Sequence, residues 1–286
     1  MKTAVITTGG LGSRLLTCTK INPKTMLPLY HKSFPISEPI LQPLIETIFE
    51  NLFDTGFRRF CIIISAKTGK SIIKHIMPDV EYVNLLKQRN VPSDKQFIKV
   101  LERLNKKINK CEIKWIFQET PMGFGDALLK AKKFVGRSTF LLHAGDVYFP
   151  DYSFLKDMLV FHKKTSSNST IMLQEMNSLK GFGIAQTRLE KGNNIVFHVE
   201  EKPKKPLGNY AILPIYIFDS EIFSALKNII QGHNGELQVT DAIQYLINSN
   251  KKITGFNFKK GSWFDIGTPK NYYKALSYSL KQSTNI

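Results

Sequence analysis

The sequence predicts an α/β domain whose central sheet is largely parallel and carries helices on both faces. Through the first half of the chain, short apolar segments typical of strands alternate with amphipathic segments typical of helices. A glycine-rich turn also follows the first apolar run, Ala4-Val5-Ile6. Buried parallel strands are near-continuous apolar runs, and each needs a crossover helix before its neighbour. At 286 residues, the chain is long enough for one large α/β domain or two small ones.

The expected elements follow from hydrophobic periodicity and from the turn residues that bound each run. After Gly181 the apolar residues alternate with polar ones, which indicates strands with one solvated face. The expected strands are Thr3–Thr7, Phe60–Ser65, Ile113–Phe117, Phe140–His143, Thr170–Leu173, Phe182–Thr187, Ile195–Glu200, Ala211–Phe218 and Ile253–Phe258. The expected helices are Glu38–Leu52, Gly69–Met77, Phe124–Phe134, Tyr152–Lys163, Ser220–Ile230, Val239–Asn248 and Pro269–Leu280, with a further helix starting near Ser13.

Residues 78–110 differ from the segments around them because they are polar and highly charged. They fall between one strand–helix unit and the next strand. We expect a helical insertion at the edge of the sheet, and a lid or an oligomer contact are the alternatives. The whole chain, 1–286, is expected to form a single domain.

Composition excludes several classes of protein. The net charge is +17, but the lysines are scattered, which favours a solvated basic surface over a nucleic-acid partner. No apolar run approaches the length of a membrane span or a signal peptide, so we expect a soluble, cytoplasmic protein. The three cysteines are odd in number and include no C-x-x-C, which argues against a zinc site or a disulfide framework.

The glycine-rich turn is the first candidate site. Glycines fold tightly and let backbone N–H groups approach an anion closely, and a helix starting near Ser13 would add its positive end. The pattern lacks the G-K-[ST] of a Walker loop, and by itself it is equally consistent with an ordinary strand-to-helix turn. The candidate phosphate-binding residues are Gly9, Gly10, Gly12, Ser13, Arg14 and Lys24.

Two further candidates follow strand ends. Gln118 precedes a Pro-x-Gly turn, and its amide offers the donors and acceptor needed to read a base edge, although the segment alone would suit any strand–turn–helix junction. Asp146 comes just after a buried strand, where α/β sheets place ligands. A carboxylate there suits Mg²⁺, which prefers oxygen ligands and substrate phosphates. The neighbouring His143 is expected to be structural.

Taken together, these segments resemble the signature motifs of the sugar-1-phosphate nucleotidyltransferase family, and within it most closely the bacterial and archaeal UTP–glucose-1-phosphate uridylyltransferases. The resemblance runs from Lys2 to about Leu280 outside 78–110, with the motifs in family order. The matching segments are Gly9–Arg14, Pro23–Pro28, Gln118–Ala127, Leu141–Val147, Gly181–Ile184, Val199–Pro203, Gly235–Ala242 and Trp263–Pro269.

The resemblance implies a three-layer, Rossmann-like nucleotidyltransferase domain with a mixed, mostly parallel sheet. It implies a nucleotide-binding part at 1–175 and a sugar-binding part at 176–286. The implied catalytic residues are Arg14, Lys24 and Lys202, and the implied nucleotide contacts are the glycine loop, Gln118 and Gly123. The implied sugar contacts are Gly183, Glu201, Lys202 and Asn209, and the implied Mg²⁺ ligands are Asp146 and Asp265. Thr240 and Asp241 either contact substrate or cap a helix.

The implied reaction is transfer of a nucleotidyl group from UTP to glucose 1-phosphate, which gives UDP-glucose and pyrophosphate. Thymidylyl transfer from dTTP and a non-catalytic regulatory subunit are the alternatives. The implied partners are a nucleoside triphosphate, a sugar 1-phosphate and further copies of the chain, with no membrane. Thr17, Thr25 and Val147 depart from the common family residues, and the first two bear on the choice of nucleotide and sugar more than on the class of reaction.

Overall fold

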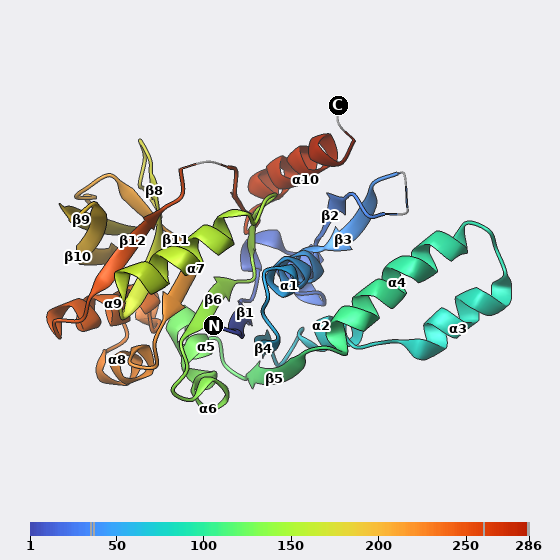
Figure 1. The fold of residues 1–286 in the computed structure, drawn as a ribbon, viewed down its shortest axis with the longest axis horizontal. Helices are drawn as coiled ribbons and strands as arrows, with labels where there is room; N and C mark the ends of the chain where they lie inside the picture. Colours follow the sequence, from blue (N-terminus) through green and yellow to red (C-terminus); the bar gives the residue numbers. More distant parts are fainter. Residues whose placement is uncertain (35, 37, 260, 285–286) are drawn as a thin grey trace.

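The computed structural model describes residues 1–34, 36, 38–259 and 261–284. Within them, one nine-stranded sheet runs through the molecule (Figure 1). Its strands, in spatial order, are β5 (Glu112–Gln118), β4 (Arg59–Ser65), β1 (Thr3–Thr8), β6 (Phe140–Ala144), β11 (Tyr210–Phe218), β8 (Ser169–Glu175), β12 (Ile253–Asn257), β10 (Asn193–Glu201) and β9 (Gly183–Glu190).

The sheet is mixed, and the expectation of a mostly parallel one is not confirmed. β5, β4, β1 and β6 are parallel to one another, as are β8 and β12. Antiparallel pairing joins β6, β11 and β8, and also β12, β10 and β9. The reason is local in part, because β9 and β10 are joined by Lys191 and Gly192, both with positive φ. Such a two-residue turn forms a hairpin rather than a crossover.

Helices cover both faces of the sheet, as expected, and strand alternation builds a core on each side. Along β1, Ala4 and Ile6 face one core while Val5 faces the other. The first core packs against α1 (Leu44–Asp54), α2 (Lys70–Ile76), α7 (Phe154–Thr165) and α10 (Pro269–Thr284). The second packs against α5 (Phe124–Lys130), α6 (Lys132–Val135), α8 (Ile222–Asn228) and α9 (Val239–Asn248).

Three expected helices differ from the structure, and the one expected over Phe124–Phe134 is divided into α5 and α6. The helix expected over Glu38–Leu52 begins only at Leu44, because Pro43 lies at its N-cap with extended backbone. The residues before it form β3 (Ile40–Pro43), which pairs with β2 (Pro28–His31). The helix expected near Ser13 is a single 3-10 turn, Ser13–Leu15, which follows Gly12 in the left-handed region. The glycine loop therefore receives no long helix dipole.

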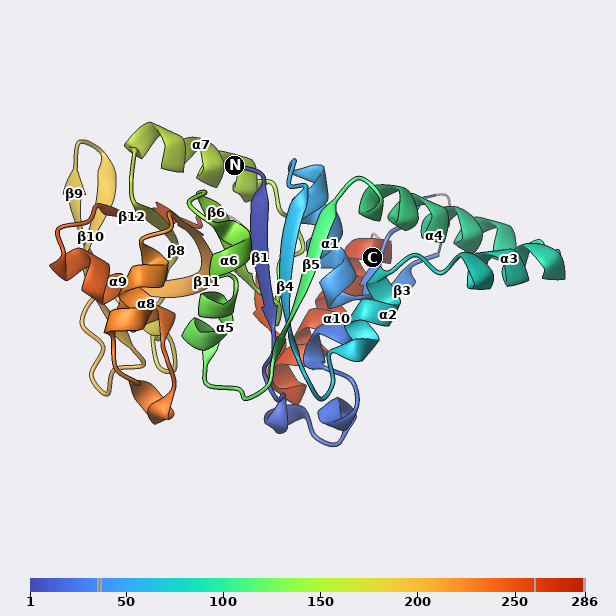
Figure 2. The same cartoon turned by 90° about the horizontal axis from the view of Figure 1, so that it is seen from below.

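Residues 78–110 form a helical hairpin that projects beyond the β5 edge of the sheet (Figures 1 and 2). It consists of α3 (Val80–Arg89) and α4 (Asp94–Ile108). Towards its tip, Val83, Leu86 and Ile98 form a small cluster of their own. At its base, α4 contributes Leu104 and Ile108 to the main core. Among the described residues, the hairpin thus joins the main core through the base of α4.

None of the described helices is long and apolar enough to cross a bilayer.

Candidate active site

A cavity of about 540 Å³ opens at the carboxyl ends of β1, β5 and β6, where α/β sheets bind ligands. It also reaches β9, β10 and β11 from the second half of the chain. The sequence-predicted site residues that line it are Gly9, Gly10, Gly12, Ser13, Arg14, Lys24, Gln118, Gly123, Asp146, Gly183, Glu201, Lys202 and Asp265. One fold position therefore collects residues from both halves of the chain.

Asn209 is the exception among the predicted residues. It is exposed, and it lines a separate shallow hollow with Glu175, Asn177 and Gly208 rather than the main cavity. Its backbone carbonyl accepts a hydrogen bond from Met176 N–H at 3.0 Å. A sugar contact by Asn209 stays a prediction, and in this arrangement of the loop the side chain does not reach the cavity wall.

The glycine loop lies between Lys24, at one end of the cavity, and Gln118, at the other. Thr19 Oγ1 donates to the Gly12 carbonyl at 2.7 Å, which closes the loop on itself. A Cβ on Gly10 would lie 3.6 Å from Lys24 Nζ, and a Cβ on Gly9 would lie only 2.2 Å from Gln118 Oε1. The loop backbone thus approaches a cation at one end and an amide at the other, and a larger residue at position 9 would displace that amide.

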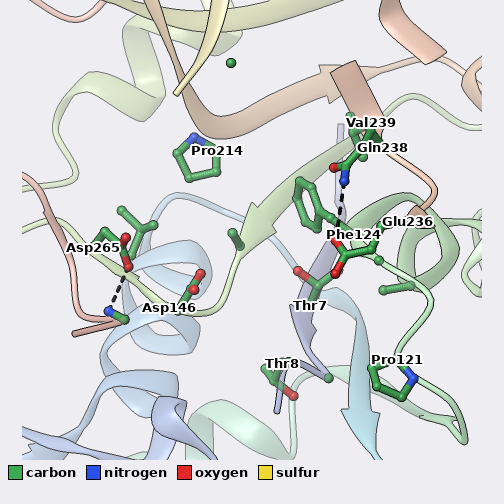
Figure 3. Close-up of a pocket in the computed structure, with 18 of the residues that line it drawn as sticks. Thr7, Thr8, Pro121, Phe124, Asp146, Pro214, Glu236, Gln238, Val239 and Asp265 are labelled. Atoms are coloured by element: carbon green, nitrogen blue, oxygen red, sulfur yellow. Dashed lines mark hydrogen bonds between the residues drawn. The ribbon is translucent and has the colours of Figure 1, made fainter. Parts of the chain in front are cut away.

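The first end of the cavity is charged. Asp146 follows β6, and Lys24 Nζ donates to its carboxylate. Asp265 belongs to β13 (Phe264–Asp265), which pairs antiparallel with β7 (Val147–Tyr148). Ile266 N–H then donates to the Asp146 carbonyl at 3.0 Å. This short ladder brings two carboxylates from distant parts of the chain together (Figure 3).

The charges of this end shift the carboxyl groups in opposite directions. Burial alone would raise the pKa of Asp146, but the Lys24 ammonium group and Arg14 lower it below its ordinary value. Burial and then the neighbouring Asp146 carboxylate raise the pKa of Asp265. Arg14 lies against the Gly267 backbone, where a Cβ would meet Arg14 Nη2 at 2.7 Å. The acidic pair is therefore only partly neutralised by the protein.

The pair has the donor chemistry of a Mg²⁺ site. Asp265 Oδ1 accepts the Gly267 N–H at 2.7 Å, and its Oδ2 receives no hydrogen bond from the described residues. Among the described residues, no group of three or more His, Cys, Asp or Glu side chains is arranged to hold a metal ion by itself. Mg²⁺ needs no such group, since one or two carboxylates plus substrate phosphates and water complete its shell.

The second end of the cavity is formed by the predicted base-reading residues. Gln118 is buried and ends β5. Gly123 has a φ of 106°, and a Cβ there would lie 2.8 Å from Glu236 Cβ. Gly125 N–H donates to Leu237 O at 2.8 Å, which fixes the start of α5 against that segment. Figure 3 shows Phe124, Glu236 and Gln238 grouped there, away from Asp146 and Asp265.

A third group connects the sugar-binding candidates. Thr240 Oγ1 donates to Glu201 Oε2 at 2.7 Å, and Lys202 Nζ lies 3.2 Å from Glu201 Oε1. Gly183 leaves room for this carboxylate, since a Cβ there would lie 3.0 Å from it. The N-cap of α9 is Gln238, with no side-chain capping bond. Capping was therefore the wrong interpretation of Thr240, whose hydroxyl is directed to Glu201.

Sequence reasoning gave no role to several cavity residues, among them Pro214, Tyr216, Gln238 and Trp263. Pro214 and Tyr216 lie on β11, which the apolar pattern marked only as core. A signal was present, because a proline inside a central strand indicates a bulge, and the β11–β8 register shifts between Leu213 and Tyr216. Burial and then Glu201 raise the pKa of Tyr216, so its phenol stays neutral.

His143 agrees with its expected structural character. It is fully buried, with Nε2 3.0 Å from the Tyr152 hydroxyl and Nδ1 2.7 Å from Ala144 O. Burial lowers its pKa to about 4, so the ring is neutral near pH 7.

Among proteins of known sequence, the chain is 32% identical to the UTP–glucose-1-phosphate uridylyltransferase of Mycoplasma pneumoniae, over 100% of this chain and 94% of that protein. It is also 32% identical to the Bacillus subtilis enzyme of the same name, over 93% and 87%. Relatives therefore align along essentially the whole chain.

Solved structures show the same fold. An apo UDP-glucose pyrophosphorylase superposes with a TM-score of 0.84 at 24% identity, covering 99% of each chain. The UTP-bound UGPase of Acinetobacter baumannii superposes with a TM-score of 0.81 at 22% identity, covering 99% of this chain and 94% of that one. The family description "Nucleotidyl transferase" matches residues 3–282, and the chain belongs to that enzyme family.

Proposed function

We propose that the chain transfers the uridylyl group of UTP to glucose 1-phosphate, with UDP-glucose and pyrophosphate as products. The observation that carries the proposal is one cavity with three distinct parts. Cations and an acidic pair lie at one end, and an amide and a tight glycine turn lie at the other. The third part consists of Glu201, Lys202 and Thr240, from the second half of the chain. The relatives named above, which carry this activity in their names, support the choice of UTP and glucose 1-phosphate.

The residues of the cavity suit an in-line displacement. An oxygen of the sugar phosphate attacks the α-phosphorus of UTP, the new O–P bond forms, and the bond to the β-phosphate bridging oxygen breaks. Lys202 holds the attacking phosphate, and Lys24 the phosphates at the reacting centre. Arg14 stays beside the leaving pyrophosphate, whose charge it offsets as the bond breaks. No nucleophilic side chain is required, because positioning and charge stabilisation supply the rate.

Asp146 and Asp265 are the residues that would hold Mg²⁺, and the ion supplies charge neutralisation on the phosphate oxygens when bound. Lys24 has a second role here, because its ion pair with Asp146 places the ammonium group at the phosphate end before substrate enters. Thr240 positions Glu201 so that its carboxylate can accept hydrogen bonds from sugar hydroxyls. Magnesium dependence, a cytoplasmic location and assembly into homo-oligomers stay predictions.

The test is a product assay on the purified chain with Mg²⁺ and glucose 1-phosphate. UTP, dTTP, CTP, ATP and GTP are supplied in turn, and pyrophosphate and nucleotide sugar are measured. We expect UDP-glucose to form only when both substrates and the metal are present. Faster turnover of dTTP than of UTP would replace this proposal with the thymidylyl alternative, and no product from any pair of substrates would favour a non-catalytic subunit.

A further inference from the structure

The orientation of the Gln118 amide is dictated by its neighbours. Gln118 Nε2 donates to Asp126 Oδ2 at 2.8 Å and to the Gly123 carbonyl at 3.3 Å. An ionised carboxylate and a backbone carbonyl can only accept hydrogen bonds. The amide nitrogen must therefore point towards Asp126 and Gly123, because the flipped amide would set its oxygen against two acceptors.

This orientation leaves the amide oxygen for the ligand. Gln118 Oε1 lies above Gly9, at 2.2 Å from the place where a Cβ would stand, so glycine at this position provides the room that the oxygen occupies. Gly9 and Gln118 both line the cavity. The base end of the cavity consequently presents a fixed hydrogen-bond acceptor, although a glutamine can in general present either a donor or an acceptor.

Asp126 is itself held in place. It lies in the first turn of α5, whose start is fastened to Leu237 by the Gly125 N–H. Its Oδ2 faces Gln118, while Lys130 Nζ lies 3.6 Å from its Oδ1. A position in the first turn already favours an acidic residue through the helix dipole. The dipole, however, does not account for the direct bond to a buried amide at the cavity wall.

We propose that Asp126 is a positioning residue that sets pyrimidine selectivity by holding the Gln118 carbonyl oxygen towards the base. The inference rests on the proposed function, which places the base of the nucleotide at Gln118. Uracil presents an N3–H donor to this oxygen. Cytosine presents an unprotonated N3 at the same place, so two acceptors would face each other and CTP is rejected. Thymine carries the same N3–H, so Asp126 does not separate UTP from dTTP.

The test compares UTP with CTP in Asp126→Asn. The shape of the side chain is kept, but asparagine offers a donor as well as an acceptor, so both orientations of Gln118 become accessible. We expect the ratio of kcat/KM for UTP to kcat/KM for CTP to fall about five- to ten-fold, mainly through a higher KM for UTP. Asp126→Glu keeps an obligate acceptor and should retain more of the ratio. Lys133→Gln, at an exposed lysine of α6 that does not contact Asp126, is the control and should leave it unchanged.

Two additions separate selectivity from general damage. Asp126→Ala gives a second measurement that does not depend on how asparagine packs, and circular dichroism checks the folding of each variant. In a Gln118→Ala background, Asp126→Asn should change the ratio no further, because its effect passes through the amide. A folded Asp126→Asn or Asp126→Ala protein with the wild-type ratio overturns the role of Asp126. By contrast, wild-type protein that forms no UDP-glucose overturns the proposed function.

Discussion

Two acidic clusters in this chain contain similar groups but differ in how many of their carboxylate oxygens have a hydrogen-bond or ion-pair partner. Outside the cavity, Gln42 Nε2 bridges Glu46 Oε1 at 2.7 Å and Glu50 Oε2 at 2.8 Å. His75 Nε2 lies 2.7 Å from the other Glu46 oxygen, and Lys107 Nζ lies 3.0 Å from the other Glu50 oxygen. Every carboxylate oxygen of this pair therefore has a partner within the protein.

The cavity pair, Asp146 and Asp265, is left incomplete by contrast. One Asp265 oxygen has no partner in the described chain, and its pKa is raised by burial and by Asp146. The Glu46–Glu50 cluster joins α1 to α2 and α4, whereas the Asp146–Asp265 pair opens onto the cavity. An acidic pair therefore indicates a site only where the fold leaves its charge uncompensated beside open space.

The first prediction is that the cavity pair controls turnover rather than stability. Asp146→Asn and Asp265→Asn should each lower kcat about 10²–10³-fold, because a fixed charge at the reacting phosphates is lost. The unfolding midpoint in urea should stay close to that of the wild type. Steady-state pyrophosphate release gives the rate, and Asp157→Asn, an exposed aspartate on α7, is the control. Normal turnover in both folded variants would place the metal-binding role elsewhere.

The second prediction is a loss of stability at the Glu46–Glu50 cluster with little change in turnover. Lys107→Met should lower the free energy of unfolding by about 1–3 kcal/mol, because the buried Glu50 carboxylate loses its cation. The loss stays in this range because the ion pair is not fully shielded from water. Turnover should change little, since neither residue lines the cavity. Urea unfolding measures the loss, and Lys106→Met, an exposed lysine of the same helix, is the control.

Lys107→Met should also change how the stability of the protein depends on pH. Burial raises the pKa of Glu50, but Lys107 and Gln42 outweigh it and hold the pKa below its ordinary value of 4.5. In the wild type, this stabilisation is complete above 4.5 and is lost as the pH falls towards the lowered native value. Lys107→Met removes the largest lowering contribution, so the pKa of Glu50 should rise and acidification through that window should lose less stability. An unchanged pH slope would contradict the assignment of the shift to Lys107.

We expect the mildest change at Glu201 and Thr240, the proposed sugar-binding group. Thr240→Val removes the hydroxyl that donates to Glu201 while the helix stays packed. We expect the KM for glucose 1-phosphate to rise about five-fold with kcat nearly unchanged, as for one lost hydrogen bond. Ser249→Ala, which removes a hydroxyl from the end of α9, is the control. An equal rise in the KM for UTP would indicate general damage to the cavity rather than a sugar contact.

Much of the fold and many of the site residues could be predicted from local pattern. β4, β6 and α9 lie within a residue of their expected bounds, because apolar runs and turn residues act over short distances. The error at Glu38–Leu52 was also local in origin, since Pro39 and Pro43 both oppose a continuous helix there. The pairing of Asp265 with Asp146 came from resemblance and not from any spacing in the chain.

Local sequence pattern was enough to establish which chemical groups are available: a glycine loop, cations after it, an amide and a carboxylate at strand ends. Which of these groups meet depends on how the whole chain folds. The β7–β13 ladder set Asp265 beside Asp146, and the start of α5 set Asp126 against Gln118. Folding also turned Thr240 from a capping candidate into a partner of Glu201. Such contacts join residues far apart in the chain, so they depend on the register of the whole sheet, which no short segment specifies.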